Sequence, residues 1–68
     1  MGNRRKRRFK VRGEDGRVRT IGEVQSHRGA KKEYAALYEP PVGYHIVVWP
    51  MDDRDDERRM RITEGDLR

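Results

Sequence analysis

The apolar residues of this 68-residue chain are few, and they gather in short clusters. Residues 18–24 and 34–49 hold the two main clusters, and residues 9–11 and 60–62 hold shorter ones. Hydrophobic residues make up 32% of the chain and charged residues 43%, which suffices for one small core and one domain. Without cysteine, neither a disulfide nor a thiolate metal site can reinforce that core. A domain with so small a core often needs a binding partner or self-association to be stable.

Alternation of polar and apolar residues predicts two strands joined by a tight turn. Residues 8–12 and 17–24 both follow the period of a half-buried strand. Residues 13–16 between them contain an Asp-Gly step, which is typical of β-hairpins. Gly22, inside the second strand, indicates a bulge or a bend.

Strong helix formers predict a helix over residues 30–39. One face of that helix would carry Ala30, Tyr34, Leu37 and Tyr38. A strand over the same residues is the alternative. The proline pair at positions 40 and 41 ends either element.

Two further strands are predicted in the second half of the chain. Residues 44–49 are β-branched and aromatic, the composition of a strand. Residues 58–63 alternate again, and a helix that begins in the acidic run at 52–57 is the alternative there.

This order of elements, β-β-α-β-β, predicts a mainly β member of the α+β class. A small antiparallel four-stranded sheet with one short helix fits it, and so does a bent small barrel. Residues 8–68 would form this single small domain. Residues 1–7 would form a flexible basic arm, because they are polar and Arg-rich.

Positive charge is concentrated at the start of the chain. The first twelve residues carry seven bases and no acid, so the rest of the chain is at −2 although the total is +5. A run of bases gains affinity for a polyphosphate by releasing counterions, and it reads no base sequence. The arm therefore predicts a polyanionic ligand.

The strand alternation divides the side chains between two faces of the sheet. The predicted core face, covered by Tyr34, Leu37 and Tyr38, comprises Phe9, Val11, Val18, Val24, Tyr44, Ile46, Val48, Met60 and Ile62. The predicted opposite face comprises Arg8, Lys10, Arg12, Arg17, Arg19, Ile21, Glu23, His45, Val47, Trp49, Arg59 and Arg61. This second face is cationic and has an aromatic residue among its cations.

Such a face predicts a small nucleic-acid-binding module, for either DNA or RNA. Arg offers forked donors that match phosphate, and an indole ring offers a surface on which a base can stack. Trp49 has a second interpretation, as a core residue. The predicted binding residues are Arg4, Arg5, Lys6, Arg7, Arg8, Lys10, Arg12, Arg17, Arg19, Trp49, Arg59 and Arg61.

The acidic run at residues 52–57 lacks the ligand spacing of a calcium loop and contains Arg54. We predict no metal site there. Pairing of this run with the basic arm is a further hypothesis, since it would reduce non-specific polyanion binding.

No residue pattern supports catalysis or a cofactor. Ser26 and His27 are adjacent in a polar loop, which is not a catalytic triad, and two histidines without a thiol do not build a zinc centre. We therefore expect a non-enzymatic protein without a cofactor. The longest apolar run, at residues 46–49, is too short for a membrane span, and the expected location is the cytoplasm.

A protein-interaction or regulatory module is the alternative function. Tyr, Trp and Arg are enriched at interface hot spots, and this chain has several of each except for its single Trp. A short, Arg-rich, cysteine-free chain also resembles the small proteins that phages and plasmids encode to bind host machinery. A homodimer, formed through edge strands, is compatible with both functions.

Overall fold

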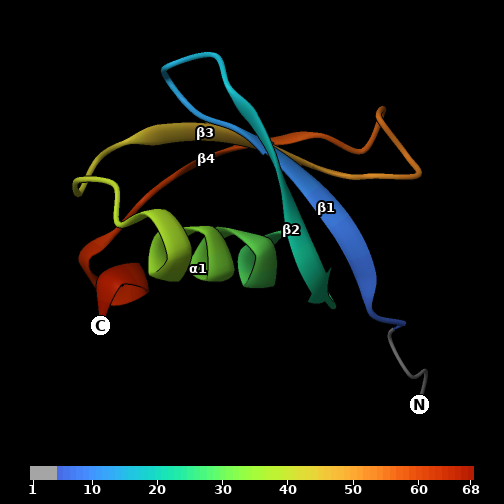
Figure 1. Cartoon of the computed structure of the whole chain (residues 1–68), viewed down its shortest axis with the longest axis horizontal. Coiled ribbons are helices and arrows are strands. Elements are labelled where there is room, and N and C mark those ends of the chain that lie inside the picture. The colour runs from blue at the N-terminus through green and yellow to red at the C-terminus, as the bar shows by residue number, and fades with distance from the viewer. Residues whose placement is uncertain (1–4) are drawn as a thin grey trace.

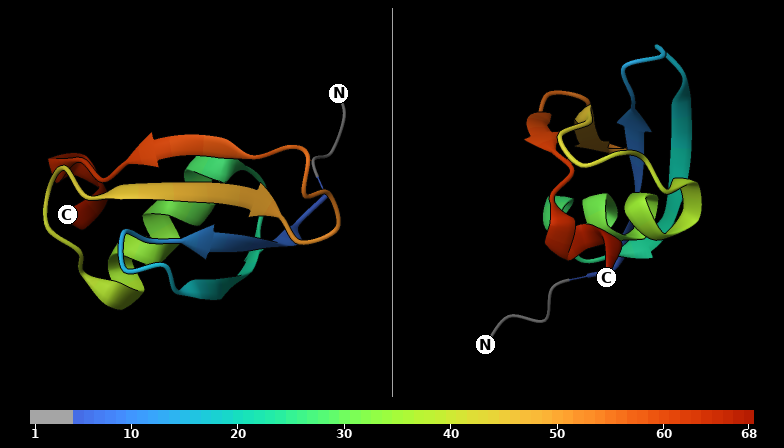
Figure 2. Two further views of the ribbon diagram at one scale, coloured as in Figure 1. Left: turned by 90° about the horizontal axis from the view of Figure 1, so that it is seen from above. Right: turned by 90° about the vertical axis from the view of Figure 1, so that its left-hand side faces the viewer.

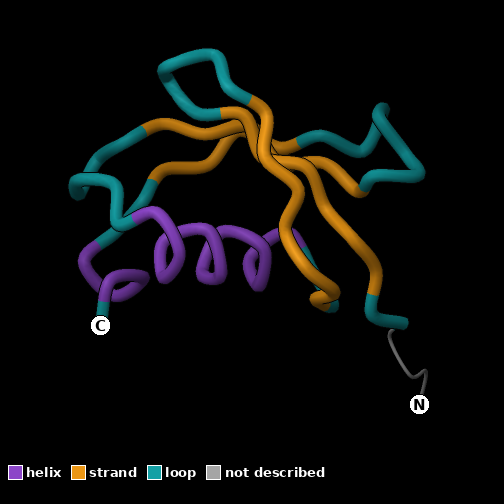
Figure 3. The backbone as a smooth tube through the Cα atoms, in the orientation of Figure 1, coloured by secondary structure: helices purple, strands orange, loops and turns teal. Residues whose placement is uncertain are grey.

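The computed structural model describes residues 5–68, which form an open four-stranded sheet with a helix on one side (Figure 1; Figure 3). The elements are β1 (Arg7–Arg12), β2 (Val18–Val24), α1 (His27–Tyr38), β3 (His45–Pro50), β4 (Arg58–Arg61) and the 3₁₀ helix η1 (Glu64–Leu67). All neighbouring strands are antiparallel, in the order β2-β1-β3-β4. The predicted fold class is confirmed, and the sheet does not close into a barrel.

The β1–β2 hairpin forms where the alternation and the Asp-Gly step predict it. Its turn closes with a hydrogen bond of 3.0 Å from the Gly16 N–H to the Gly13 carbonyl. Gly16 has a φ of +80°, a conformation that glycine adopts without a steric cost. Phe9 pairs with Ile21, and Arg7 pairs with Val24. The two pairs are two residues apart in β1 but three residues apart in β2, so β2 has one extra residue there. This irregularity confirms the bulge predicted at Gly22.

The bulge changes which side chains of β2 face the core. Ile21 is fully buried and Val18 is 50% exposed, whereas the alternation predicted the reverse. The prediction was wrong because directly paired residues share a face. Ile21 lies opposite the buried Phe9, while Val18 lies opposite the exposed Arg12.

Helix α1 begins three residues before the predicted start and is capped at both ends. The Ser26 hydroxyl accepts a hydrogen bond of 3.1 Å from the Gly29 N–H, which satisfies one free donor of the first turn. Glu39 adopts the left-handed conformation that ends many helices, and its N–H donates to the Ala35 carbonyl. The helical interpretation of residues 30–39 is therefore confirmed.

The core lies between α1 and one face of the sheet, and the opposite face is left open (Figure 2, left). Phe9, Val11, Ile46 and Val48 from the central strands are at most 1% exposed. From α1, the side chains that enter the core are Ala30, Tyr34 and Ala35. Leu37 was also predicted there, but it lies on the outer side of the helix and is 56% exposed. Tyr38 lies beside Tyr34, with ring centres 5.0 Å apart, but it is 40% exposed and stays at the edge of the core.

An ion pair joins α1 to η1 near the C-terminus. The Lys31 ammonium lies 3.1 Å from an Asp66 carboxylate oxygen, and both side chains are largely buried. Partial burial opposes ionisation of Asp66, but hydrogen bonds from the Thr63 N–H, from Lys31 and from the Thr63 hydroxyl outweigh it and lower the Asp66 pKa. The ionised carboxylate therefore stabilises the folded chain.

This lowered pKa predicts a specific dependence of stability on pH. A carboxylate with a lowered folded pKa stabilises the fold above its unfolded pKa, and the effect is lost as the pH falls through the folded pKa. We expect Asp66→Asn to reduce the free energy of unfolding by about 1–2 kcal/mol at neutral pH. The difference from the wild type should shrink as the pH falls below about 4. Urea unfolding of the wild type and of the variant, at several pH values across this range, measures the difference in the free energy of unfolding. A difference that stays constant with pH would contradict the prediction.

Candidate nucleic-acid interface

The face of the sheet opposite α1 gathers cations from two strands, β1 and β4. We call this surface the open face and define it by its outward side chains: Arg8, Lys10 and Arg12 of β1, Thr20 and Val18 of β2, His45, Val47 and Trp49 of β3, and Arg59 and Arg61 of β4. The register fixes this arrangement, because Val47 lies opposite both Arg12 and Arg59 while His45 lies opposite Arg61. Three guanidinium groups thus surround one apolar position.

A hollow of about 590 Å³ lies among these groups. Its charged lining comes from Arg12, Arg59, Arg61 and Glu14, together with the His45 ring. The Glu14 carboxylate is held in place, since it accepts a hydrogen bond of 2.8 Å from the His45 N–H. The remaining forked donors suit an oxyanion such as phosphate.

Trp49 is on the open face, yet it is only 7% exposed. The guanidinium carbon of Arg54 lies 4.1 Å from the centre of the indole ring and covers it. Beside it, Lys10 donates a hydrogen bond of 2.7 Å to the Thr20 hydroxyl. Both interpretations of Trp49 thus hold in part: it belongs to the predicted face, and it is buried there by a residue of the β3–β4 loop.

Arg54 also binds Glu57, three residues further on. The hydrogen bond from Arg54 lowers the pKa of Glu57, and the charges of Arg54, Arg12 and Arg59 lower it further, against a smaller effect of desolvation. Glu57 is therefore a carboxylate held by Arg54, and its pKa is lowered further by the open-face arginines. Arg54 and Glu57 were not predicted as site residues, because only their spacing of three residues marks them as a pair.

The structure brings together half of the predicted binding residues. Arg8, Lys10, Arg12, Trp49, Arg59 and Arg61 share the open face. Arg5 and Lys6 precede β1 and are exposed, and Arg17 lies in the hairpin turn at the end of the sheet. Arg4 lies outside the described residues.

Two predicted residues lie on the helix side instead. The Arg19 guanidinium is 4.3 Å from the centre of the Tyr38 ring, and its strand partner is the buried Val11. The prediction of Arg19 on the cationic face was wrong for the same reason as that of Ile21. Arg7 stacks on Phe9 and lies 3.7 Å from Asp52.

The hypothesis that the acidic loop pairs with the arm can be compared with the structure only for the part of the arm in residues 5–7. Within residues 5–68, the ion pair between Arg7 and Asp52 joins the two segments, and both side chains are substantially exposed. Exposed pairs of this kind contribute little. The loop is held more firmly at the other end, where His27 Nε2 donates a hydrogen bond of 2.7 Å to the Asp56 carbonyl.

No protein-family model matches this sequence, and neither a curated protein nor a solved structure matches it. Over residues 5–68, no helix has both the length and the apolar character needed to cross a membrane. A function for this protein therefore has to be inferred from the described structure itself, and the open face is the surface that supports one.

Proposed function

We propose that the protein binds nucleic acid, with the sugar-phosphate backbone lying on the open face against Arg12, Arg59 and Arg61. The observation that carries this proposal is that three arginines, from two strands, line one hollow. Guanidinium groups bind phosphate with paired hydrogen bonds as well as with charge.

The spacing of the cations supports a polymer rather than a small anion. Arg8, Lys10 and Arg12 recur at every second position of β1, so their Cα atoms repeat about every 6–7 Å along the strand. Such a row suits a chain with regularly repeated charges. The bases that precede β1 continue the positive charge from the same strand, which supports the predicted role of the arm.

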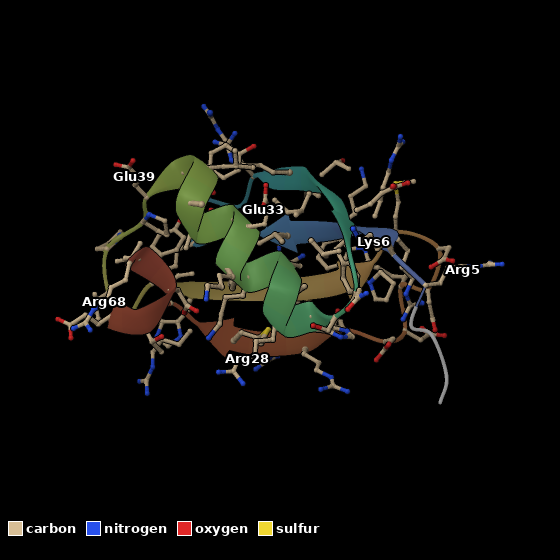
Figure 4. The ribbon with its side chains drawn as sticks, turned by 90° about the horizontal axis from the view of Figure 1, so that it is seen from below. Arg5, Lys6, Arg28, Glu33, Glu39 and Arg68 are labelled. Atoms are coloured by element: carbon tan, nitrogen blue, oxygen red, sulfur yellow. The ribbon has the colours of Figure 1, made fainter. Side chains whose placement is uncertain are left out.

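The opposite side of the molecule differs in charge and in shape. Figure 4, seen from below, shows α1 in front of the sheet, with Arg28, Glu33 and Glu39 labelled along it. Arg28 and Lys32 are exposed on this side, but so are Glu33 and Glu39, so the helix side offers no comparable cationic row. The open face is therefore the better surface for a polyanion.

An NMR titration tests this proposal. Short DNA and RNA oligonucleotides are added separately to isotope-labelled protein. We expect amide shifts in β1, β3, β4 and the β3–β4 loop, and none at Arg28, Lys32 or Leu37 on the outer side of α1. Shifts confined to α1 would contradict the proposed surface. No shift with either nucleic acid would reject the function and favour docking on a partner protein.

A further inference from the structure

The β3–β4 loop folds back over the sheet through two consecutive turns. The Asp53 N–H donates to the Pro50 carbonyl at 3.0 Å, and the Asp56 N–H donates to the Asp53 carbonyl at 3.1 Å. His27 then anchors the loop through the Asp56 carbonyl. This path brings the side chain of Arg54 back onto Trp49, the penultimate residue of β3.

The side chains of Arg54 and Glu57 can leave the open face without disturbing the core. They are 52% and 39% exposed, and neither belongs to the buried cluster between α1 and the sheet. An exposed ion pair contributes little to stability, and a guanidinium that is itself half exposed contributes about 0.5–1 kcal/mol when it stacks on an aromatic ring. Their present positions are therefore easily exchanged for those of a ligand.

Together the two side chains imitate a nucleotide in shape and charge. The guanidinium is flat and lies against the indole ring at 4.1 Å, where a base would stack. The Glu57 carboxylate is an anion paired with that guanidinium, and Arg12 and Arg59 flank Val47, two residues before Trp49 on the same face, where a phosphate would bind. A flat group on an aromatic ring and an anion joined to it at short range are the two parts of a nucleotide.

We infer that Trp49, Arg12 and Arg59 form a subsite for one unpaired nucleotide, which the Arg54–Glu57 pair occupies until nucleic acid displaces it. This inference rests on the proposed function and adds the class of ligand, single-stranded nucleic acid. A base inside a duplex is stacked on both faces and cannot reach the indole ring, whereas an unpaired base can. The ligand would then gain a stacked base at the cost of one exposed ion pair.

A charge-neutral double variant tests the exchange. Arg54→Ala with Glu57→Gln uncovers Trp49 and removes one positive and one negative charge. Arg68→Ala with Glu64→Gln removes the same charges from an exposed ion pair near the C-terminus, and serves as the control. Affinities are measured for a single-stranded oligonucleotide and for an abasic oligonucleotide of the same length, which keeps the phosphates but has no bases.

We expect the Arg54/Glu57 variant to bind the single-stranded oligonucleotide about tenfold more tightly than the wild type does. Its affinity for the abasic oligonucleotide should rise much less, because that ligand gains a phosphate position but has no base to stack, and the control should match the wild type with both. Single-strand affinity that is unchanged or reduced, or an equal change with both ligands, would overturn the inference. If no protein bound either ligand, the proposed function itself would fail.

Trp49 fluorescence provides a second readout that needs no variant. Trp49 is the only tryptophan, so the signal reports this subsite alone. Titration of the wild-type protein should quench it with the single-stranded oligonucleotide and leave it nearly unchanged with the abasic one. Equal responses to both ligands would show that no base stacks on the ring.

Discussion

Replacement of Arg12, Arg59 and Arg61 together by threonine is expected to weaken nucleic-acid binding about a hundredfold at low salt. The three side chains line the hollow of the open face and are exposed, so their loss removes phosphate contacts and leaves the core intact. Threonine suits a strand, which protects the sheet. Fluorescence anisotropy with a labelled oligonucleotide measures the loss, and thermal unfolding checks that the variant folds.

A triple variant of equal charge controls for net charge alone. Arg28 and Lys32 of α1 and Arg68 at the C-terminus are exposed. Figure 4 shows Arg28 and Arg68 on the helix side of the molecule, away from the open face. Their replacement by alanine should reduce affinity by only a few fold, because distant exposed charges are screened by salt. Equal losses in the two triple variants would show that net charge binds the ligand and that the open face has no special role.

Phe9→Ala is expected to unfold most of the protein at room temperature. Phe9 is fully buried at the centre of the sheet, packs edge-on against the His27 ring and lies opposite both Ile21 and Pro50. Truncation of a buried Phe costs about 3–5 kcal/mol, and a core of this size rarely supplies more than about 3–5 kcal/mol in total. Urea titration followed by circular dichroism should show little or no folding transition.

Leu37→Ala provides the matched control for that experiment. Leu37 is also a large apolar residue, but it lies on the outer side of α1, and alanine is an excellent helix former. Its replacement should change the free energy of unfolding by less than about 0.5 kcal/mol. A loss of several kcal/mol would mean that α1 is rotated about its axis relative to the described structure.

The order of elements could be predicted because local signals agree with one another. The Asp-Gly turn, the helix formers before the two prolines and the β-branched run at residues 44–49 each indicate one element. Short connections then make β1–β2 and β3–β4 antiparallel pairs. The pairing of β1 with β3 joins strands far apart in the sequence, and no local signal predicts it. Gly22 indicated the bulge, but it did not indicate which side chains of β2 would change face. Because of the one extra residue, Ile21 lies on the core face and Val18 on the open face.

The candidate site was predicted in part. The cations of β1 and β4 were placed on one face because both strands follow the regular alternation. Arg19 was misplaced because the face of β2 was assigned from Val18 and Val24, on opposite sides of the bulge. The cover on Trp49 could not be predicted, since it depends on two turns that direct the β3–β4 loop back over β3.

The most direct test of the open face as a phosphate-binding surface is the salt dependence of binding to a DNA oligonucleotide. Each phosphate contact adds about 0.7–0.9 to the slope of log affinity against log salt. The wild-type slope should therefore exceed that of the Arg12/Arg59/Arg61 variant by about 2 to 3, while the control triple variant keeps a slope close to that of the wild type. Equal slopes in the wild type and the open-face variant would contradict a nucleic-acid interface on this surface.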